Sequence, residues 1–229
     1  MRESILMTKL HLFHHQRSSG SFHIKKNSLN NVVQKPVHLY GLVLSGGKSE
    51  RMGKDKGLIK YHKVPQREHL YRLLDQLCEV TFLSVRPSQY SNIPKGARAI
   101  VDQNRYNGPF NGIMSAHNTH KNAAWLVLAC DLPFMDLATL QQLINARDPK
   151  KSATAFLGPK TEKPEPLACI WEPGGLEKAV HFLKKAEQSG PRKFLMDSEI
   201  TLVTPKNEQA LFNANTDLDY TYAKDMLRG

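Results

Sequence analysis

A glycine turn followed by a run of cations is the first feature of this sequence that could do chemistry. The apolar run from Tyr40 to Leu44 ends in Ser45-Gly46-Gly47, and four cations follow within nine residues: Lys48, Arg51, Lys54 and Lys56. Two glycines let the backbone approach a phosphate without a Cβ in the way, and backbone N–H groups and basic side chains bind anions. The stretch therefore predicts a binding site for a phosphate chain.

Two well-known phosphate-binding motifs do not fit this turn. A Walker A loop has four residues between its first glycine and Gly-Lys-Ser/Thr. Here five residues separate Gly47 from Gly53-Lys54-Asp55, and the metal-binding hydroxyl is missing. The G-x-G-x-x-G fingerprint of dinucleotide-binding domains is also absent from this turn. Neither a P-loop ATPase nor a dehydrogenase is favoured.

Two aspartates stand where apolar runs end. Asp131 closes "WLVLACD" and Asp102 closes "AIVD". The carboxyl ends of parallel strands share one edge of a sheet, so two such carboxylates can converge on one metal–nucleotide complex. A strand-end aspartate also serves as a turn or helix-capping residue, and the residues alone leave both roles open.

The elements that must position these residues alternate between strand and helix patterns. Apolar runs predict strands at 38–45, 80–85, 97–102, 123–131, 152–158, 165–172 and 200–205. Apolar residues at helical spacing predict helices at 67–79, 113–120, 136–147, 175–188 and 217–228. This alternation predicts an α/β fold: a single doubly wound, Rossmann-like, mostly parallel sheet with helices on both faces.

The first 36 residues differ from the rest. They are rich in His, Ser and Asn and show no clear period, so we expect a flexible tail at 1–36 and one domain at 37–229. The formal net charge of +11 suits anionic partners, but residues 1–36 hold six Lys or Arg against one Glu. A nucleic-acid-binding protein is the competing class. The remainder lacks a basic helix or an aromatic-interleaved RNA motif, so we expect no nucleic-acid partner.

The cysteines and the hydropathy of the sequence bear on the cellular compartment in which the protein is found. Three cysteines lie far apart, without metal-ligand spacing, and their odd number argues against a disulfide framework. No run of 18 apolar residues predicts a membrane span, and the N-terminus lacks the pattern of a secretory signal. We therefore expect a cytoplasmic protein without a membrane partner.

The stretch "LSGGKSERMGKDKGL" resembles the signature loop of the MobA-like nucleotidyltransferase family. The resemblance covers about residues 39–226, with further family-like stretches in the same order: "VDQNRYNGPFNGI", "LACDLPFM", "EPLACIW", "GPRKFLMD" and "NANTDLDY". The "DKGL" ending is similar to the guanylyl branch of that family. Two departures are visible. The glycine usual before "VPQREHL" is missing, and "GPFNG" replaces Gly-Pro-Leu-Ala-Gly.

The resemblance implies an activity. Members of the guanylyl branch transfer GMP from GTP to the phosphate of molybdenum-molybdopterin, forming molybdopterin guanine dinucleotide and pyrophosphate. Their partners would then be GTP, molybdenum-molybdopterin and the cofactor-insertion proteins that receive the product. The alternative is a cytidylyltransferase acting on the same or another phosphorylated acceptor, because few contacts read the base.

The resemblance also assigns roles to residues. It implies nucleotide contacts by Leu44, Ser45, Gly46, Lys56, Asp102 and Asp131. It implies catalytic roles for Arg51, Lys56 and Asp131, with Asp131 as the ligand of a Mg²⁺ cofactor. From their charge, Arg192 and Lys193 in "GPRKFL" are candidates for holding an acidic acceptor.

Overall fold

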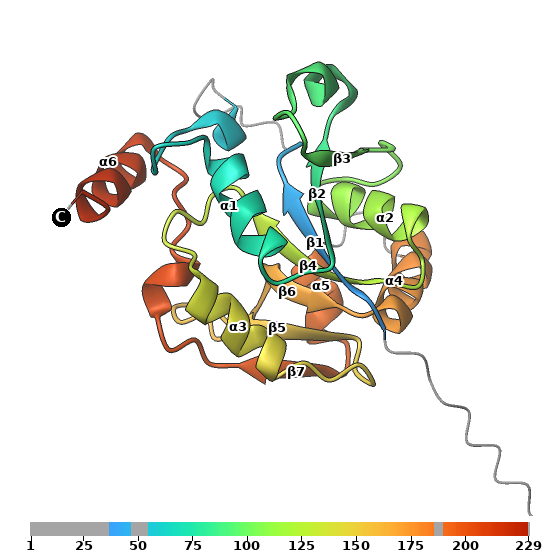
Figure 1. Cartoon of the computed structure of the whole chain (residues 1–229). Helices are drawn as coiled ribbons and strands as arrows, with labels where there is room; N and C mark the ends of the chain where they lie inside the picture. The colour runs from blue at the N-terminus through green and yellow to red at the C-terminus, as the bar shows by residue number, and fades with distance from the viewer. Residues whose placement is uncertain (1–36, 47–54, 186–189, 229) are drawn as a thin grey trace, which may run out of the picture. The chain divides into compact units, whose positions relative to one another are not determined.

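The sheet has seven strands and is mostly parallel, as the sequence predicts. The structure, a computed structural model, describes residues 37–46, 55–185 and 190–228. Its strands are β1 (Leu39–Leu44), β2 (Val80–Val85), β3 (Arg98–Val101), β4 (Ala124–Ala129), β5 (Ala153–Leu157), β6 (Pro164–Trp171) and β7 (Ile200–Val203). They lie in the order β3-β2-β1-β4-β6-β5-β7 (Figure 1). β6 runs antiparallel to β4 and β5, and the other neighbours are parallel.

Helices cover both faces of this sheet. The helices are α1 (Gln66–Asp75), α2 (Pro109–Thr119), α3 (Leu137–Asn145), α4 (Pro173–Lys185), α5 (Pro191–Met196) and α6 (Asp217–Met226). Buried residues of α1 and α3 belong to one apolar cluster, and those of α2, α4 and α5 belong to a second. The predicted α/β class with helices on both faces is therefore confirmed.

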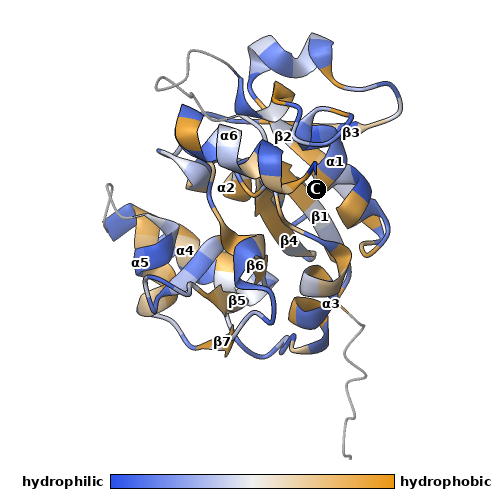
Figure 2. Cartoon of the chain, turned by 90° about the vertical axis from the view of Figure 1, so that its left-hand side faces the viewer, coloured by the Kyte–Doolittle hydropathy of each residue, from blue (hydrophilic) through white to orange (hydrophobic). Residues whose placement is uncertain are grey.

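The central strand β4 shows why the core has two halves. Its six residues are all buried. Trp125 and Val127 enter the cluster beneath α2 and α4, whereas Leu126 and Leu128 enter the cluster beneath α1 and α3. Successive side chains of a strand point to opposite faces, so a strand covered on both sides must be apolar throughout. Figure 2 shows β4 in the orange of hydrophobic residues.

Predicted and observed elements agree in order, with small differences at their ends. The largest differences are four residues: α1 ends at Asp75 rather than at 79, and α2 begins at Pro109 rather than at 113. Proline suits the first turn of a helix because its missing N–H needs no partner there. The short helix α5 and three 3-10 helices were not predicted; the latter are η1 (Lys56–Leu58), η2 (Pro87–Asn92) and η3 (Glu208–Leu211).

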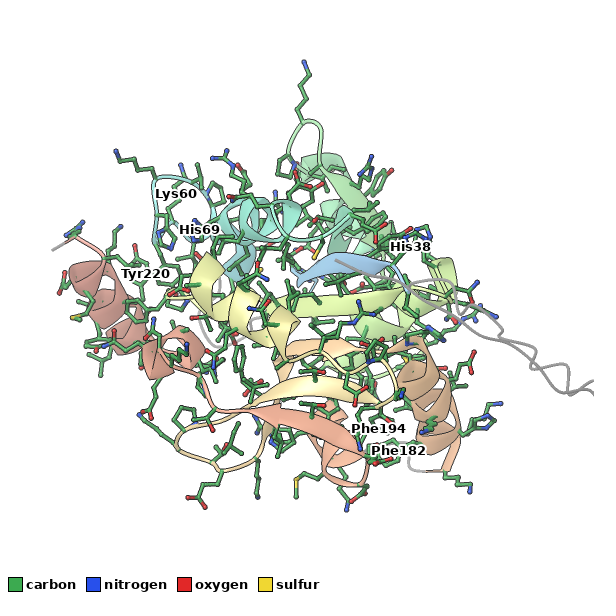
Figure 3. The ribbon with its side chains drawn as sticks, turned by 60° about the horizontal axis from the view of Figure 1, so that its bottom comes forward. His38, Lys60, His69, Phe182, Phe194 and Tyr220 are labelled. Carbon is green, nitrogen blue, oxygen red and sulfur yellow. The ribbon has the colours of Figure 1, made fainter. Side chains whose placement is uncertain are left out.

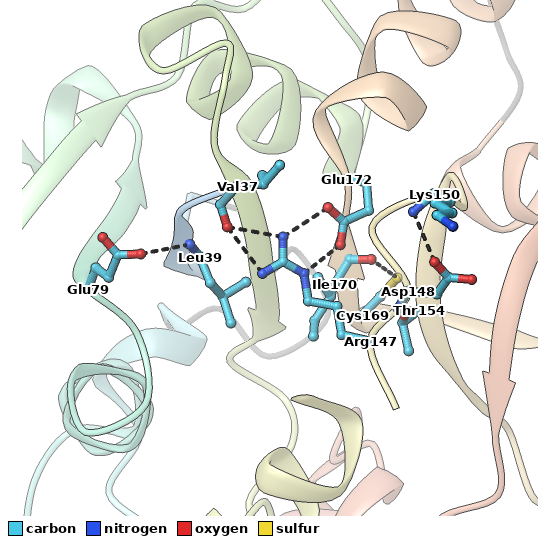
Figure 4. Close-up of polar contacts among 10 residues, drawn as sticks. All are labelled: Val37, Leu39, Glu79, Arg147, Asp148, Lys150, Thr154, Cys169, Ile170 and Glu172. Atoms are coloured by element: carbon cyan, nitrogen blue, oxygen red, sulfur yellow. Dashed lines mark hydrogen bonds and ion pairs between the residues drawn. The ribbon is translucent and has the colours of Figure 1, made fainter. Parts of the chain in front are cut away.

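A buried ion pair between Arg147 and Glu172 lies beside Val37, the first described residue (Figure 4). Arg147 donates to both carboxylate oxygens of Glu172, at 2.7 and 3.0 Å, and to the carbonyl oxygen of Val37 at 3.3 and 3.4 Å. The Glu172 side chain is only 1% exposed. Removing one partner of such a pair would leave a buried charge unpaired, so the pair holds the Arg147 guanidinium where it also binds the Val37 carbonyl.

None of the described helices is both long enough and apolar enough to cross a bilayer.

Candidate active site

The strand order gathers the predicted site residues at one edge of the sheet. β1, β2, β3 and β4 are parallel neighbours, so their carboxyl ends share that edge. The chain runs from β1 outward through β2 and β3 and then returns to β4 on the other side of β1. Ligands of open α/β sheets bind at such a change of direction.

A cleft of about 790 Å³ lies at this edge. Its lining comes from the ends of β1 to β4, from η1 and the start of α2, and from the chain before α6. The residues that line it include Leu44, Ser45, Gly46, Asp55, Lys56, Ser84, Arg86, Asp102, Asn104, Gly108, Gly112, Cys130, Asp131, Leu167 and Asn215.

Ser84, near the end of β2, connects the two neighbouring strand ends. Its carbonyl oxygen accepts hydrogen bonds from the backbone N–H of Ser45 at 3.0 Å and from the Ser45 hydroxyl at 2.8 Å. Its hydroxyl donates to Oδ1 of Asp102 at 2.6 Å. Burial raises the pKa of Asp102, while the Ser84 hydrogen bond and the charge of Arg86 lower it. The hydrogen bond from Ser84 thus holds the Asp102 side chain in the lining of the cleft.

Two glycines allow this close packing. An ideal Cβ at Gly46 would lie 2.4 Å from Oδ2 of Asp102, and one at Gly112 would lie 2.4 Å from the Ser84 hydroxyl oxygen. Real Cβ atoms do not approach other atoms so closely. Glycine at position 46 lets the turn after β1 pack against Asp102, and glycine at position 112 lets α2 pack against Ser84.

Lys56 faces Asp131 across the cleft. Its amine nitrogen lies 3.8 Å from Oδ2 of Asp131 and donates to Oδ1 of Asn215 at 2.7 Å. The backbone N–H of Ala214 donates to the carbonyl oxygen of Asp131 at 2.9 Å. Segments far apart in sequence therefore place one cation, one carboxylate and one amide together.

One carboxylate oxygen of Asp131 meets no hydrogen-bond donor in the part of the chain that the structure describes. This oxygen, Oδ1, is buried and has no hydrogen-bond partner among the described residues. Burial raises the pKa of Asp131, and the nearby Lys56 opposes that effect. A buried carboxylate oxygen without a partner is costly, so it is suited to a ligand that supplies positive charge.

The structure places most of the predicted residues together. Leu44, Ser45, Gly46, Lys56, Asp102 and Asp131 all line the cleft. Arg51 lies outside the described residues. Arg192 and Lys193 are not in the described lining: Arg192 pairs with Glu165 at 2.9 Å, and Lys193 pairs with Asp197 at 3.0 Å.

Three further residues at or beside this edge were not predicted from the sequence: Asn215, Asp55 and Gln89. Asn215 lies in the family-like stretch "NANTDLDY", which could have pointed to it. Asp55 precedes Lys56 in "DKGL" and caps η1 by accepting from the backbone N–H of Gly57 at 2.9 Å. Gln89 contacts Asp55 and Ser45, and no sequence pattern singles it out.

The donor set is compatible with one hard divalent cation shared with a substrate. Among the described residues no group of three or more His, Cys, Asp or Glu side chains could hold a metal ion without help. Asp131 offers a free carboxylate oxygen in a cleft large enough for phosphates. Magnesium sites commonly use one or two carboxylates and take their remaining ligands from phosphate and water.

The fold and this cleft are those of an open α/β protein with a ligand-sized cleft at the carboxyl ends of its parallel strands. The family described as the MobA-like NTP transferase domain matches residues 41–202, and the chain belongs to that family.

Relatives of similar sequence agree with this membership. The chain is 37% identical over 194 residues to a molybdenum cofactor biosynthesis bifunctional protein of Synechocystis, covering 83% of this chain but 54% of that protein. It thus spans about half the length of that relative. It is 30% identical to a molybdenum cofactor guanylyltransferase of Pseudomonas fluorescens, covering 76% of this chain and 88% of the relative.

A crystal structure shares the fold. It is molybdopterin-guanine dinucleotide biosynthesis protein A of Archaeoglobus fulgidus, with a TM-score of 0.66 and 20% identity. The match covers 82% of this chain and 98% of that one.

Proposed function

We propose that this chain transfers GMP from GTP to the phosphate of molybdenum-bound molybdopterin and releases pyrophosphate. The observation that carries the proposal is the meeting of Gly46, Lys56, Asp102 and Asp131 in one cleft at the strand ends. Relatives named molybdenum cofactor guanylyltransferase support the choice of guanylyl group and acceptor.

In the proposed reaction, an oxygen of the acceptor phosphate attacks the α-phosphorus of GTP. A new P–O bond forms, the bond from the α-phosphorus to the bridging oxygen of the β-phosphate breaks, and pyrophosphate leaves with the electron pair. Two anions must be brought together in line, so positioning and charge neutralisation supply most of the catalysis. No covalent enzyme intermediate is required.

Each residue has a defined part in this scheme. Lys56, held by Asn215, places a compact positive charge toward the triphosphate. The turn at Ser45 and Gly46 brings backbone groups close to the nucleotide. Asp102 is fixed by Ser84 to accept hydrogen bonds from the nucleotide.

Asp131 would hold a divalent cation, for which we propose Mg²⁺. Its free Oδ1 and its position opposite Lys56 fit that role. When bound, Mg²⁺ supplies positive charge that stabilises the transferring phosphoryl group. Asp131 and Lys56 border the same space, so this side of the cleft is where we expect the phosphates.

A titration with GTP, CTP, ATP and UTP in the presence of Mg²⁺ tests the proposal, followed by measurement of pyrophosphate release with molybdenum-molybdopterin. We expect GTP to bind most tightly and to support transfer. A site that pairs with guanine leaves polar groups unsatisfied when cytosine enters, so the preference should be large. Faster transfer from CTP would establish the cytidylyl alternative, and failure of all four nucleotides to bind would refute both.

The product would then pass to proteins that insert the cofactor into enzymes. We propose such proteins as partners on the chemistry of the product, which is useful only after delivery.

A further inference from the structure

Gln89 is a buried amide behind the cleft. It lies in η2, which follows β2, and its exposed fraction is 6%. It does not belong to the described lining of the cleft, so it is not placed to touch a substrate directly. A polar side chain buried this deeply must have its hydrogen-bonding groups satisfied, and its partners indicate its role.

The amide of Gln89 uses both of its ends. Nε2 donates to the carbonyl oxygen of Ser45 at 3.1 Å and to Oδ2 of Asp55 at 2.6 Å. Oε1 accepts from the backbone N–H of Arg86 at 2.9 Å and from its Nε at 3.3 Å. The orientation of the amide follows from chemistry, because an ionised carboxylate and a carbonyl only accept, and Arg86 only donates at these atoms.

These bonds join the two ends of the predicted phosphate-binding stretch. Ser45 stands directly before Gly46, and Asp55 stands directly before Lys56. One nitrogen therefore holds both Ser45, which follows β1, and Asp55, which precedes η1. Asp55 is held at its other oxygen by the N–H of Gly57, so its position is transmitted to η1 and to Lys56.

We propose that Gln89 is a positioning residue for nucleotide binding, which sets the separation between the Gly46 backbone and the Lys56 amine by bridging Ser45 and Asp55. We call these two donated hydrogen bonds the Gln89 bridge. The proposal rests on the proposed function for its substrate. A nucleotide spans both groups at once, so a shift between them weakens binding without removing either group.

The variant Gln89→Glu tests the bridge with almost no change in shape. It keeps an acceptor for Arg86, but its second oxygen faces the Ser45 carbonyl and the Asp55 carboxylate and donates to neither. We expect the Kd for Mg-GTP to rise about tenfold, since hydrogen bonds to charged groups are worth about this much. Gln89→Met, which removes the bridge without adding charge, should act in the same direction and keeps the test valid if Gln89→Glu does not fold.

A second change should restore part of the loss. When Gln89→Glu is combined with Asp55→Asn, the amide introduced at position 55 can donate to the carboxylate introduced at position 89, while its oxygen still accepts from Gly57. We expect the Kd of this double variant to return toward the wild-type value. A residue that only stabilises the fold would show no such specific recovery.

Gln142 provides a matched control. Its Nε2 donates to the carbonyl oxygen of Thr204 at 2.7 Å and its Oε1 accepts from the N–H of Lys206 at 3.1 Å, so both ends of its amide also bind backbone groups of a distant segment, here the one after β7. It lies in α3 and is not in the described lining of the cleft. Gln142→Glu should leave the Kd for Mg-GTP within about twofold, whatever it does to the melting temperature.

Two further measurements test whether Gln89 acts by positioning Lys56. In a Lys56→Ala background, Gln89→Glu should cost clearly less than in the wild type, because the group it positions is gone. Hydrogen exchange of the Gly57 amide should be faster in Gln89→Glu, and this readout needs no nucleotide. If wild-type protein binds no nucleotide, the proposed function fails and the exchange experiment alone judges the bridge.

The inference is overturned if folded Gln89→Glu binds Mg-GTP as tightly as the wild type, or if its Gly57 amide exchanges no faster. A loss of equal size in Gln142→Glu would likewise assign the effect to general stability.

Discussion

The space that a Cβ of Gly46 would occupy is already taken by Oδ2 of Asp102, at 2.4 Å. The turn after β1 and the residue after β3 are therefore packed so closely that only glycine, which has no Cβ, fits at position 46. Asp102 has no easy way to move aside, because its Oδ1 accepts from the Ser84 hydroxyl at 2.6 Å.

Gly46→Ala should consequently damage the site. We expect nucleotide affinity to fall by about tenfold or more and the melting temperature to drop, because overpacking a fixed group costs about 1–3 kcal/mol. Gly174→Ala, in α4, is the control: nothing lies within 4 Å of its ideal Cβ. That change should leave affinity unchanged and raise stability slightly. Normal affinity in Gly46→Ala would contradict the packing argument.

Asp131→Asn should abolish transfer without unfolding the protein. The change keeps the volume and removes the charge that would hold the cation, so we expect the rate to fall by at least about 100-fold. Since burial already disfavours the charged form of Asp131, the melting temperature should not fall. Asp136→Ala is the opposite control: it removes the cap of α3, should cost about 1 kcal/mol of stability, and should retain transfer. Rapid transfer by folded Asp131→Asn would remove Asp131 from the proposed metal site.

Lys56→Ala should weaken binding of the triphosphate more than binding of the nucleoside. We expect about a tenfold or larger rise in the Kd for GTP, because a partly buried charge close to the phosphates is lost. Lys60 offers a comparison within the same segment, since its side chain is exposed and extends away from the fold (Figure 3). Equal losses in Lys56→Ala and Lys60→Ala would mean that overall charge, rather than placement, controls binding.

Stability should fall in mild acid because of His69. Its ring stacks on His62 at a centroid distance of 3.6 Å. Burial, followed by the charges of His62 and Arg72, lowers the pKa of His69 from 6.5 to about 4. The unfolded chain then binds this proton more readily, so the stability present above pH 6.5 is lost as the pH falls toward 4.

Melting temperatures measured between about pH 7.5 and 4.5 check this expectation. His69→Gln, which does not titrate, should show a shallower decline than the wild type. Identical slopes would mean that His69 does not contribute to acid sensitivity.

Deleting residues 1–36 should leave the folded domain intact. Their sequence offers no periodic apolar face to bury, so we predict a melting temperature within about 2 °C of the full chain and an unchanged affinity for nucleotide. Extending the deletion through His38 should be harmful, because Arg147 binds the Val37 carbonyl and Leu39 begins β1. A large loss on deleting 1–36 alone would place that segment in the domain.

Local patterns along the chain were enough to locate the elements and the types of residue at their ends. Apolar runs and helical periodicity depend only on neighbouring residues, so they located all seven strands and the main helices to within a few residues. The run at 123–131, apolar up to Cys130, is also typical of a strand covered on both faces, which β4 is. The glycine turn and the two strand-end aspartates marked the candidate site for the same reason.

Which of these residues meet depended on packing in three dimensions. Lys56 and Asp131 face each other because β1 and β4 are neighbours, and strand order depends on contacts between distant segments. The antiparallel direction of β6 has the same origin, since an apolar strand pattern is identical in both directions. Gln89 lies 44 residues from Ser45 and 34 from Asp55 and carries no motif. Its role depends on a buried amide meeting complementary donors and acceptors, and that match exists only once the chain has folded.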